Sequence, residues 1–576
     1  MRIRPNPWPV FPLLLLLLMG SARAEPRCVR VRLFWLHPPT AIKVIPMEAR
    51  AGVVVHPESA AQACTWKEAI AFSADGDRLR ASGRLWRRGE FFGKIRVEGE
   101  GFAPFEVSGP LTISGYHGHL RLTARMPLED YVAAVLAGEA GGFKSDEALK
   151  AMAVAARTYA VRFLPRHAAD GFDFCDTTHC QDLRLGVEPA RVRAAVSATE
   201  GELLWYDGRP AATYYSRSCG GMIERGSVLD AALEAPYLRE HEDQFCLRSD
   251  RGEWHGEISK SELGQALASA GLKVPPRLRT VAVETRLPSG RVETLNIDGV
   301  SIPAASLRFA IGRALGWDQL RSDLYELQDD GDRIIFHGRG QGHGVGLCQS
   351  GAELMGAAGK NYQEILAYYY PGTLLGINAQ GLRWQALGGE EVEVVTTQPN
   401  ADREVVIASE RALKKARQAT GWTPGTRPQV RVFPTVSIYR DTTGQPGWVA
   451  ASTRGRVVRI EPPSVLGEKL EATLHHEFLH LLVESRARPD LPLWFREGLV
   501  LWLEQNQTNT RRRQIDLIQV ERDLRSGEQE KLRAAYPQAQ RAVGSLATQY
   551  GKDSVLNWVT TGLPPSIADS QIIGMR

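Results

Sequence analysis

The sequence lacks most of the features that would place it in a simple class. After the first 24 residues it has no apolar run long enough to cross a membrane, and it has no internal repeat and no low-complexity segment. Hydrophobic residues make up 43% and charged residues 24%, which excludes a largely disordered chain, a coiled coil and a collagen-like protein. At 576 residues, the chain is long enough for several domains.

Net charge is also nearly absent. The formal charge is +4, and three positive charges (Arg2, Arg4 and Arg23) lie in the first 24 residues, which contain no acidic residue, so the remainder carries +1. A chain this close to neutral has no global charge signature for nucleic acid. We therefore expect no nucleic-acid partner.

The most apolar segment stands at the start of the sequence. Residues 1–24 combine Arg2 and Arg4 with an apolar run from Val10 to Met19 and an Ala-Arg-Ala ending, a pattern typical of a secretory signal peptide. The run is about half the ~20 residues that a spanning helix needs. We expect an exported protein of the periplasm, cell envelope or extracellular space, with no transmembrane span after signal cleavage.

Cysteine is scarce but suits that compartment, where disulfides can form. Two candidate pairs are Cys28–Cys64 and Cys219–Cys246, although sequence alone does not assign them. An odd count leaves at least one thiol free or bound to a metal. The seven cysteines are Cys28, Cys64, Cys175, Cys180, Cys219, Cys246 and Cys348.

The residue patterns predict an α+β protein of several domains. Short β-prone runs dominate up to about residue 125, and helical spacing then predicts a helix over about 146–162, capped by Ser145. Later patterns predict helices at about 467–485 and 493–505 and a helical tail within 511–541. We predict strands at 29–35, 42–46, 53–55, 120–124, 392–396, 405–408, 430–433 and 456–460. The predicted divisions are a signal peptide (1–24), a β-rich region (25–109), a mixed domain (110–385), a linker around Gly388–Glu391 (386–399) and a second α+β domain (400–576).

Glu139 ends an apolar run that begins at Tyr131, and glycines follow shortly after it. A carboxyl group in such a setting is hard to ionise, so it can act as a general acid near neutral pH. Taken alone, a glutamate at the end of a helix is more often a helix cap or a salt-bridge partner than a catalytic acid.

Four blocks around and beyond Glu139 resemble the SpoIID/LytB family, in the family's order. They are Tyr131–Ala160, Cys175–Gln181, Tyr215–Gly221 and Gly338–Ala352, and a closing Tyr-Pro-Gly-Thr follows at 370–373. The resemblance covers roughly residues 110–380. It implies peptidoglycan as the substrate, because SpoIID-type members are lytic transglycosylases that cut glycan strands stripped of stem peptides.

This resemblance also implies roles for individual residues. The motif glutamate corresponds to Glu139, which would protonate the glycosidic oxygen and then activate the sugar's own 6-hydroxyl, giving an anhydro product without a second carboxylate. Substrate contacts are expected from Arg157, His343 and Gln349, although His343 can equally be a structural histidine. The block containing His343 is rich in glycine, lacks the Gly-Lys-Ser/Thr of a P-loop, and is interpreted as the floor of a glycan groove.

Cys175, His179 and Cys180 form a second group with metal-binding chemistry. They could hold a structural zinc with one further ligand, as some SpoIID relatives do near this position. Alternatively, Cys175 and Cys180 could form a disulfide, or Cys180 could pair with Cys219.

A different motif, H-E-x-x-H, occurs at His476-Glu477-Phe-Leu-His480. On a helix the two histidines are four residues apart and share one face, so they can bind one Zn²⁺ while Glu477 serves as general base for its bound water. Glu497, in a Trp-x-x-Glu-Gly context, is the expected third ligand. The pattern resembles gluzincin-type metallopeptidases of the MA-like clan over about residues 400–560, with Tyr536 or Tyr550 as oxyanion stabiliser and residues 456–460 as the edge strand.

Three functions are consistent with these motifs. The first is an enzyme of the cell envelope that cleaves glycan strands and carries a zinc peptidase module. The second is a glycan-binding module that does not cleave but stimulates a cell-wall amidase, as LytB-type members do. The third is a zinc protease that its SpoIID-like region targets to the wall.

Overall fold

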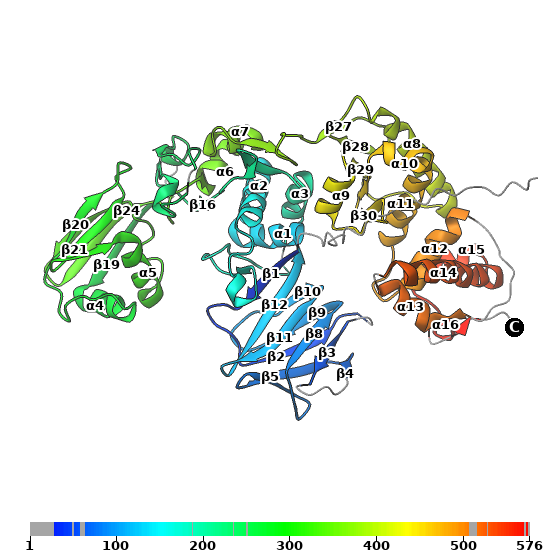
Figure 1. Ribbon diagram of the computed structural model, residues 1–576, viewed down its shortest axis with the longest axis horizontal. Helices are drawn as coiled ribbons and strands as arrows, with labels where there is room; N and C mark the ends of the chain where they lie inside the picture. The colour runs from blue at the N-terminus through cyan, green and yellow to red at the C-terminus, as the bar shows by residue number, and fades with distance from the viewer. Residues whose placement is uncertain are drawn as a thin grey trace, which may run out of the picture.

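The structure, a computed structural model, describes residues 28–48, 51–57, 64–186, 188–233, 235–248, 252–505, 515–526, 528–568 and 572–573. The predicted signal peptide at 1–24 lies outside these ranges. Several separate sheets and many helices confirm the α+β class (Figure 1). Within the described ranges, no helix has both the length and the apolar character needed to cross a membrane.

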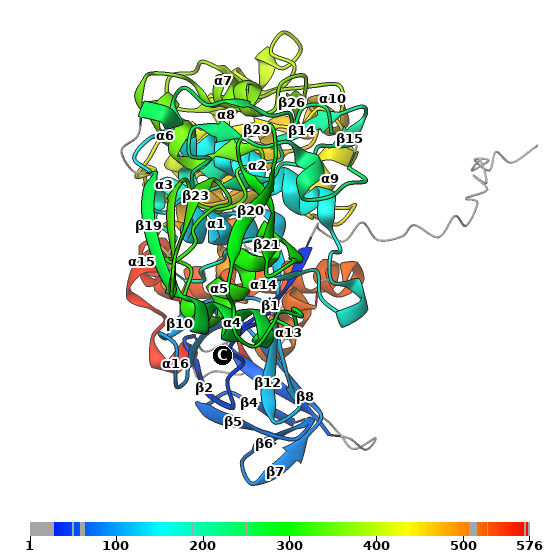
Figure 2. The same cartoon turned by 90° about the vertical axis from the view of Figure 1, so that its left-hand side faces the viewer.

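Two sheets form the N-terminal part and lie at the lower end of the molecule in Figures 1 and 2; their strands are antiparallel except for β13, which pairs parallel to β1. In β12, alternate residues from Leu120 to Met126 are buried, as expected for a sheet with one face on a core. The larger sheet contains, in spatial order, β13 (Phe174–Cys175), β1 (Cys28–Leu33), β12 (His119–Pro127), β11 (Leu111–Tyr116), β8 (Arg88–Phe92), β3 (Gly52–His56) and β4 (Cys64–Trp66). The smaller contains β10 (Phe105–Ser108), β9 (Lys94–Glu98), β2 (Ala41–Pro46), β5 (Ile70–Asp75), β6 (Arg78–Ala81) and β7 (Arg84–Trp86).

A helical layer follows directly, because β12 leads into α1 (Leu128–Glu139). The central helix is α2 (Asp146–Phe163), and Ser145 caps it as predicted, with its Oγ accepting from Ala148 N at 3.2 Å. The other helices here are α3 (Ala190–Ala198), α6 (Gln349–Ala357) and α7 (Tyr362–Tyr369). Short strands connect them: β14 (Leu203–Tyr206), β15 (Arg209–Pro210), β16 (Tyr215–Ser216), β17 (Met222–Ile223), β18 (His241–Glu242), β25 (Leu347–Cys348) and β26 (Leu374–Gly376). This layer shares one hydrophobic core with the N-terminal sheets, rather than forming a core of its own.

An insertion with its own hydrophobic core interrupts this region. It stands apart from the other parts at the left of Figure 1 and faces the viewer in Figure 2. Its elements are β19 (Glu253–Ser259), α4 (Lys260–Ser269), β20 (Val281–Arg286), β21 (Val292–Ile297), β22 (Val300–Pro303), α5 (Ala304–Leu315), β23 (Tyr325–Asp330) and β24 (Arg333–Arg339). The residue patterns predicted one mixed domain over 110–385 and no separate unit within it.

The C-terminal part is built on a five-stranded sheet in the order β27 (Gln385–Leu387), β28 (Glu393–Thr396), β29 (Gln429–Val432), β31 (Val457–Ile460) and β30 (Ala451–Arg454). Strands β28, β29 and β31 are parallel, and β30 is an antiparallel edge. Its helices are α8 (Arg403–Thr420), α9 (Val436–Thr443), α10 (Pro463–Leu466), α11 (Leu470–Glu484), α12 (Leu493–Gln505), α13 (Leu517–Arg525), α14 (Gln529–Tyr550), α15 (Lys552–Thr561) and α16 (Pro565–Ala568).

Three expectations for this part were wrong. Residues 405–408 are not a strand but lie in α8, where helical spacing continues to a left-handed Gly421 cap and overrides three β-branched residues. The strand at 456–460 is internal, and β30 is the edge. Gly388–Glu391 is not a linker but the turn of the β27–β28 hairpin.

A buried ion cluster joins the C-terminal sheet to the helical layer. Glu200, just after α3, contacts Arg431 Nη1 at 2.6 Å and Arg459 Nε at 2.9 Å, and all three residues are buried. Burial alone would raise the pKa of Glu200, but the charges of Arg459 and Arg431 lower it overall. The two parts therefore share an interface in which one carboxylate pairs with two buried arginines.

Candidate functional site

Glu139 is the last residue of α1, at the end of a helix whose other face is buried. Its Oε1 accepts from the backbone N–H of Asp182 at 3.0 Å, and its Oε2 accepts from Gln349 Nε2 at 3.2 Å. Burial is the main cause that raises the pKa of Glu139, while these hydrogen bonds oppose the shift. The carboxyl is therefore held in place yet kept easy to protonate.

Gly138 explains how the Asp182 loop can come so close. A Cβ at this position would lie 2.7 Å from the Asp182 carbonyl oxygen, so only glycine fits there. The negative charge of Asp182 also raises the pKa of Glu139, and Arg217 lowers it. Sequence reasoning missed Asp182, which adjoins the Cys175–Gln181 block.

A polar network lies beneath the carboxylate. Gln181 is buried, accepts from the Tyr131 hydroxyl at 2.9 Å and donates to the Tyr215 hydroxyl at 2.8 Å. Burial first, and then the charge of Glu139, raise the pKa of Tyr215. These tyrosines stay neutral and provide a rigid polar floor. They too were missed as site residues, although all three lie within the matching blocks.

Arg157 does not hold the substrate contact that the sequence predicted. Its side chain is fully buried and forms a bidentate pair with Glu129, with Nε and Nη2 at 2.9 and 2.6 Å from the carboxylate oxygens. Its remaining nitrogen donors bind backbone carbonyls, including those of Val196 and Glu202. Arg157 therefore ties α1 and α2 to the segment after α3, and a polysaccharide cannot reach it.

Gln349 and His343 were the other expected substrate contacts. Gln349 is buried and touches Glu139 itself, as given above. His343 Nδ1 accepts from Val345 N at 3.0 Å, and its ring meets Tyr214 edge-on. Burial, together with Arg308 and Arg291, lowers the pKa of His343 to about 3, so the ring is neutral. A substrate contact from either residue stays a prediction.

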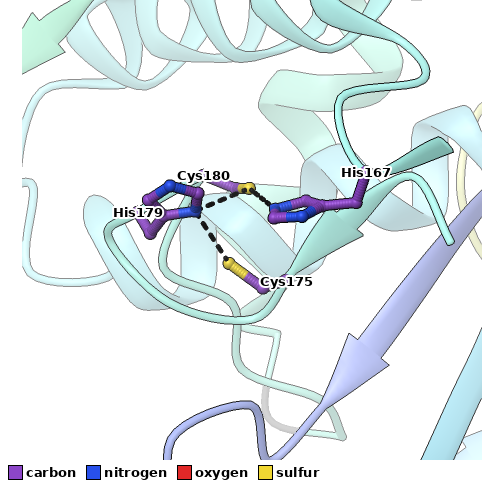
Figure 3. Close-up of side chains that lie close together, drawn as sticks. All are labelled: His167, Cys175, His179 and Cys180. Carbon is purple, nitrogen blue, oxygen red and sulfur yellow. Dashed lines mark hydrogen bonds between the residues drawn. The ribbon is translucent and has the colours of Figure 1, made fainter. Parts of the chain in front are cut away.

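Cys175, His179 and Cys180 do come together, and His167 completes the group (Figure 3). The four ligand atoms lie within 4.8 Å of one another, with His167 Nε2 3.4 Å from Cys180 Sγ and His179 Nδ1 3.6 Å from Cys175 Sγ. Both thiols are free, so neither the Cys175–Cys180 nor the Cys180–Cys219 disulfide is formed. A hydrogen bond from the Cys180 thiol lowers the pKa of Cys175. Two thiols and two imidazoles suit zinc.

His167 was missed because it lies outside the recognised block, across a surface turn. Its other ring nitrogen, Nδ1, lies 3.3 Å from Asp170 Oδ2, the arrangement that usually fixes a metal-binding histidine. The cluster immediately precedes Gln181 and Asp182. It therefore anchors the loop whose backbone N–H reaches Glu139.

The H-E-x-x-H motif lies on α11, as predicted, and Glu497 lies on α12. His476 Nε2 and His480 Nε2 are 3.1 Å apart, and Glu497 Oε2 is 3.6 Å from His480 Nε2. Burial lowers the pKa of His480 to about 3 and raises that of Glu497 to about 7. Among the described residues, the groups whose ligand atoms all lie within 4.8 Å of one another do not include this triad. Because His480 is close to both other residues, the long distance in the triad is the one between the ligand atoms of His476 and Glu497.

Neighbouring side chains hold this second group. Thr453 on the edge strand β30 donates to Glu477 Oε2 at 2.6 Å, and Glu504 Oε2 lies 3.2 Å from His476 Nδ1. Burial raises the pKa of Glu477. Sequence reasoning missed both partners. Glu504 could have been found, because it lies seven residues after Glu497 on the same helix face.

Helix α12, which carries Glu497, packs against α14. A Cβ at Gly498 would lie 2.4 Å from the Ala539 carbonyl oxygen, which explains the glycine after Glu497. Burial and the charges of Glu497 and Glu477 raise the pKa of Tyr536 to about 12. Tyr536 therefore lies near the group, whereas Tyr550 is exposed and stacks edge-on against Trp558.

Comparison with known proteins places these sites in context. Residues 116–206 match the family of the stage II sporulation protein SpoIID, and residues 233–346 match a domain of unknown function. The chain is 33% identical over 272 residues to an uncharacterized protein of Brachyspira hyodysenteriae, covering 46% of this chain and 72% of that protein.

Two further relatives carry functional names. Stage II sporulation protein D of Bacillus subtilis is 29% identical over 283 residues, which cover 46% of this chain and 79% of that protein. The amidase enhancer of Bacillus subtilis is 26% identical over 280 residues, which cover 40% of this chain and 38% of that protein. These names indicate a function related to the cell wall.

Proposed function

Since the chain belongs to the SpoIID family, we propose that it is a peptidoglycan lytic transglycosylase that uses Glu139 to cut peptide-stripped glycan strands. The observation that carries this proposal is the setting of Glu139. One carboxyl, with its pKa raised by burial, is fixed from two sides by Asp182 N–H and Gln349 Nε2.

The geometry supports a two-step role for this carboxyl. Protonated Glu139 gives its proton to the glycosidic oxygen, and the resulting carboxylate keeps the hydrogen bonds from Asp182 and Gln349. The carboxylate then takes the proton of the sugar's own 6-hydroxyl as that oxygen closes on the anomeric carbon. The nucleophile is part of the substrate, so the step benefits from proximity and needs no second carboxylate.

Digestion of peptide-stripped glycan strands by the mature chain tests this role. Wild type should release anhydro-ended fragments, and Glu139→Gln should lose the activity. Glu240→Gln, an exposed change in the same region, is the matched control and should cut like wild type. If wild type and Glu139→Gln cut equally, or neither cuts, the proposal fails.

A non-cleaving role in stimulating an amidase is the alternative that the amidase enhancer raises. It predicts that the protein releases no glycan fragments but speeds stem-peptide removal by a cell-wall amidase. Under this alternative, Glu139→Gln should stimulate as well as wild type does.

We further propose that the C-terminal part binds one zinc ion through His476, His480 and Glu497 as a metallopeptidase. The donor chemistry fits, because two imidazole nitrogens face each other at 3.1 Å beside a carboxylate, and Glu504 orients one ring. A bound zinc would acidify a water molecule, and Glu477 is placed beside the metal ligands to take its proton. Thr453 keeps the Glu477 side chain in that position.

Zinc content of the intact mature chain tests this second proposal. His480→Ala should contain one zinc fewer per chain than wild type, and Glu240→Gln should be unchanged. Equal zinc in His480→Ala and wild type would contradict it. Glu477→Gln should keep its zinc but lose hydrolysis of peptide bonds when peptide-bearing peptidoglycan is the probe.

The His167–Cys175–His179–Cys180 cluster is proposed as a separate structural zinc site. Its four ligand atoms are already gathered, and its loop supports Asp182. Cys175→Ser should therefore remove one further zinc and weaken glycan cleavage. A Cys175–Cys180 disulfide found in the purified protein would contradict the site.

A further inference from the structure

A second cluster of thiols includes Cys348 of the Gly338–Ala352 block, and none of its side chains takes part in either proposed reaction. Its members are Cys219, Asp243, Cys246 and Cys348, and their ligand atoms all lie within 4.8 Å of one another. All four residues are buried, and the three thiols are free. Cys219 follows β16, Asp243 and Cys246 follow β18, and Cys348 ends β25.

The carboxylate of this cluster is fixed in orientation. Asp243 Oδ1 accepts the backbone N–H groups of Phe245 and Cys246, both at 3.1 Å. Its Oδ2 accepts the Tyr369 hydroxyl at 3.0 Å and lies 3.3 Å from Cys219 Sγ. The carboxylate thus has its outer partners in place and turns one oxygen to the sulfurs, as ligating carboxylates do.

Backbone N–H groups also point at the sulfurs. Cys348 is the N-cap of α6, and its Sγ accepts from Gly351 N at 3.4 Å and from Cys219 N at 3.3 Å. The Ser218 hydroxyl lies 3.4 Å from Cys246 Sγ. Such donors and a helix N-terminus favour the thiolate, the form that binds metal. Arg291, the nearby cation, donates at 2.6 Å to the Cys219 carbonyl oxygen.

The close packing of α6 against Asp243 supports a preformed metal site. A Cβ at Gly351 would lie 2.1 Å from the Tyr369 hydroxyl and 2.6 Å from Asp243 Oδ2, so α6 can approach the carboxylate only through a glycine. Ligands of a tetrahedral zinc with sulfur at about 2.3 Å lie roughly 3.8 Å apart, which the observed cluster accommodates. Three thiolates suit zinc, and zinc also accepts a carboxylate oxygen as its fourth ligand.

We infer that Cys219, Asp243, Cys246 and Cys348 bind a structural Zn²⁺ that fastens both ends of the inserted domain to the site carrying Glu139. The insertion begins with β19 at Glu253, seven residues after Cys246, and ends with β24 at Arg339, nine residues before Cys348. The residue after Cys348 is Gln349, whose amide holds Glu139. The metal therefore sets the position of Gln349 as well as of the insertion.

Zinc content of the intact mature chain, purified without chelator, tests the site. Cys246→Ser should contain one zinc fewer per chain than wild type. Cys175→Ser, from the other thiol cluster, is the matched control, and Cys246→Ser should remove one zinc from that background as well. Asp243→Asn, which keeps the shape of the side chain, should release this zinc at chelator concentrations at least about tenfold lower.

If Cys246→Ser does not fold, alkylation of the native wild-type protein provides a second test. The modified cysteines are then identified by mass spectrometry of the digested protein. Cys219, Cys246 and Cys348 should resist alkylation until zinc is chelated, and all three should then react as thiols. A disulfide between any two of them, or equal zinc in Cys246→Ser and wild type, would overturn the inference.

Discussion

Glu139 and Glu477 are both carboxyls with a pKa raised by burial, yet the molecule holds them in different ways. Glu139 accepts hydrogen bonds from the Asp182 backbone N–H and the Gln349 side-chain amide, which lie 43 and 210 residues away in sequence. Glu477 is held by a hydroxyl 24 residues away and lies beside histidines on its own helix. The first site is made by long-range folding, and the second is nearly complete in two neighbouring helices.

This difference indicates how each carboxyl is used. The contacts of Glu139 come from groups that stabilise its charged form without supplying charge, which suits a group that must give and retake one proton. Glu477 lies among imidazoles and carboxylates whose arrangement suits a cation. We therefore expect the two sites to fail independently.

The largest expected effect is a complete separation of the two sites by mutation. Glu139→Gln should slow glycan cleavage by about 10²–10⁴-fold, because it removes the proposed proton donor, and should leave zinc content unchanged. His480→Ala should lower zinc by one per chain and leave glycan cleavage near the wild-type rate. Rates and metal content measured on the same preparations check this. Loss of both properties in either variant would show that the sites are coupled.

The second prediction concerns the interface between the two regions. Glu200→Ala should lower the free energy of unfolding by about 3–5 kcal/mol, because it leaves Arg431 and Arg459 buried without their partner. Urea denaturation of the mature chain measures the change, with exposed Glu240→Ala as the control. A loss below about 1 kcal/mol would mean that the regions do not rely on this cluster.

The same difference between the two sites explains which of their residues could be predicted from the sequence. The motif residues His476, Glu477 and His480 were found because a helix places them together at fixed spacing. Asp182 and Thr453 were not, because only tertiary folding brings them to their carboxylates. Arg157 was misassigned, since a pattern does not reveal that a charged side chain is fully buried.

The fold shows the same limit. Local sequence signals predicted α2 with its Ser145 cap, and they predicted the two helices that carry the H-E-x-x-H motif and Glu497. The insertion was not found, because its boundaries are set by which residues share a core. The prediction for 405–408 failed, since three β-branched residues carry less weight than the amphipathic run that continues after them.

The third prediction concerns a substitution that should weaken only the second site, the one around Glu477. Thr453→Val keeps the shape of the side chain but removes the hydroxyl that donates to buried Glu477. It should lower the free energy of unfolding by about 1–3 kcal/mol, the cost of an unsatisfied buried polar group. Urea denaturation, with the exposed Thr560→Val as control, checks it. Glycan cleavage should not change, and a parallel loss there would argue against independence.

The smallest expected effect is a shift in pH dependence at the first site. Cleavage needs protonated Glu139, so the rate should fall as pH rises through its raised pKa. Gln349 donates to the charged form and so lowers that pKa. Gln349→Leu should therefore move the alkaline limb of the rate profile to higher pH. An unmoved limb, or a move to lower pH, would show that the amide does not act through Glu139.

The origin of the oxygen in the product tests the central claim most directly. Peptide-stripped glycan is digested with wild type in water enriched in heavy oxygen, and the new ends are analysed by mass spectrometry. Attack by the sugar's own 6-hydroxyl predicts anhydro ends with no heavy oxygen. Reducing ends that each carry one heavy oxygen would mean that water is the nucleophile, with a second group such as Asp182 involved, and would contradict the account.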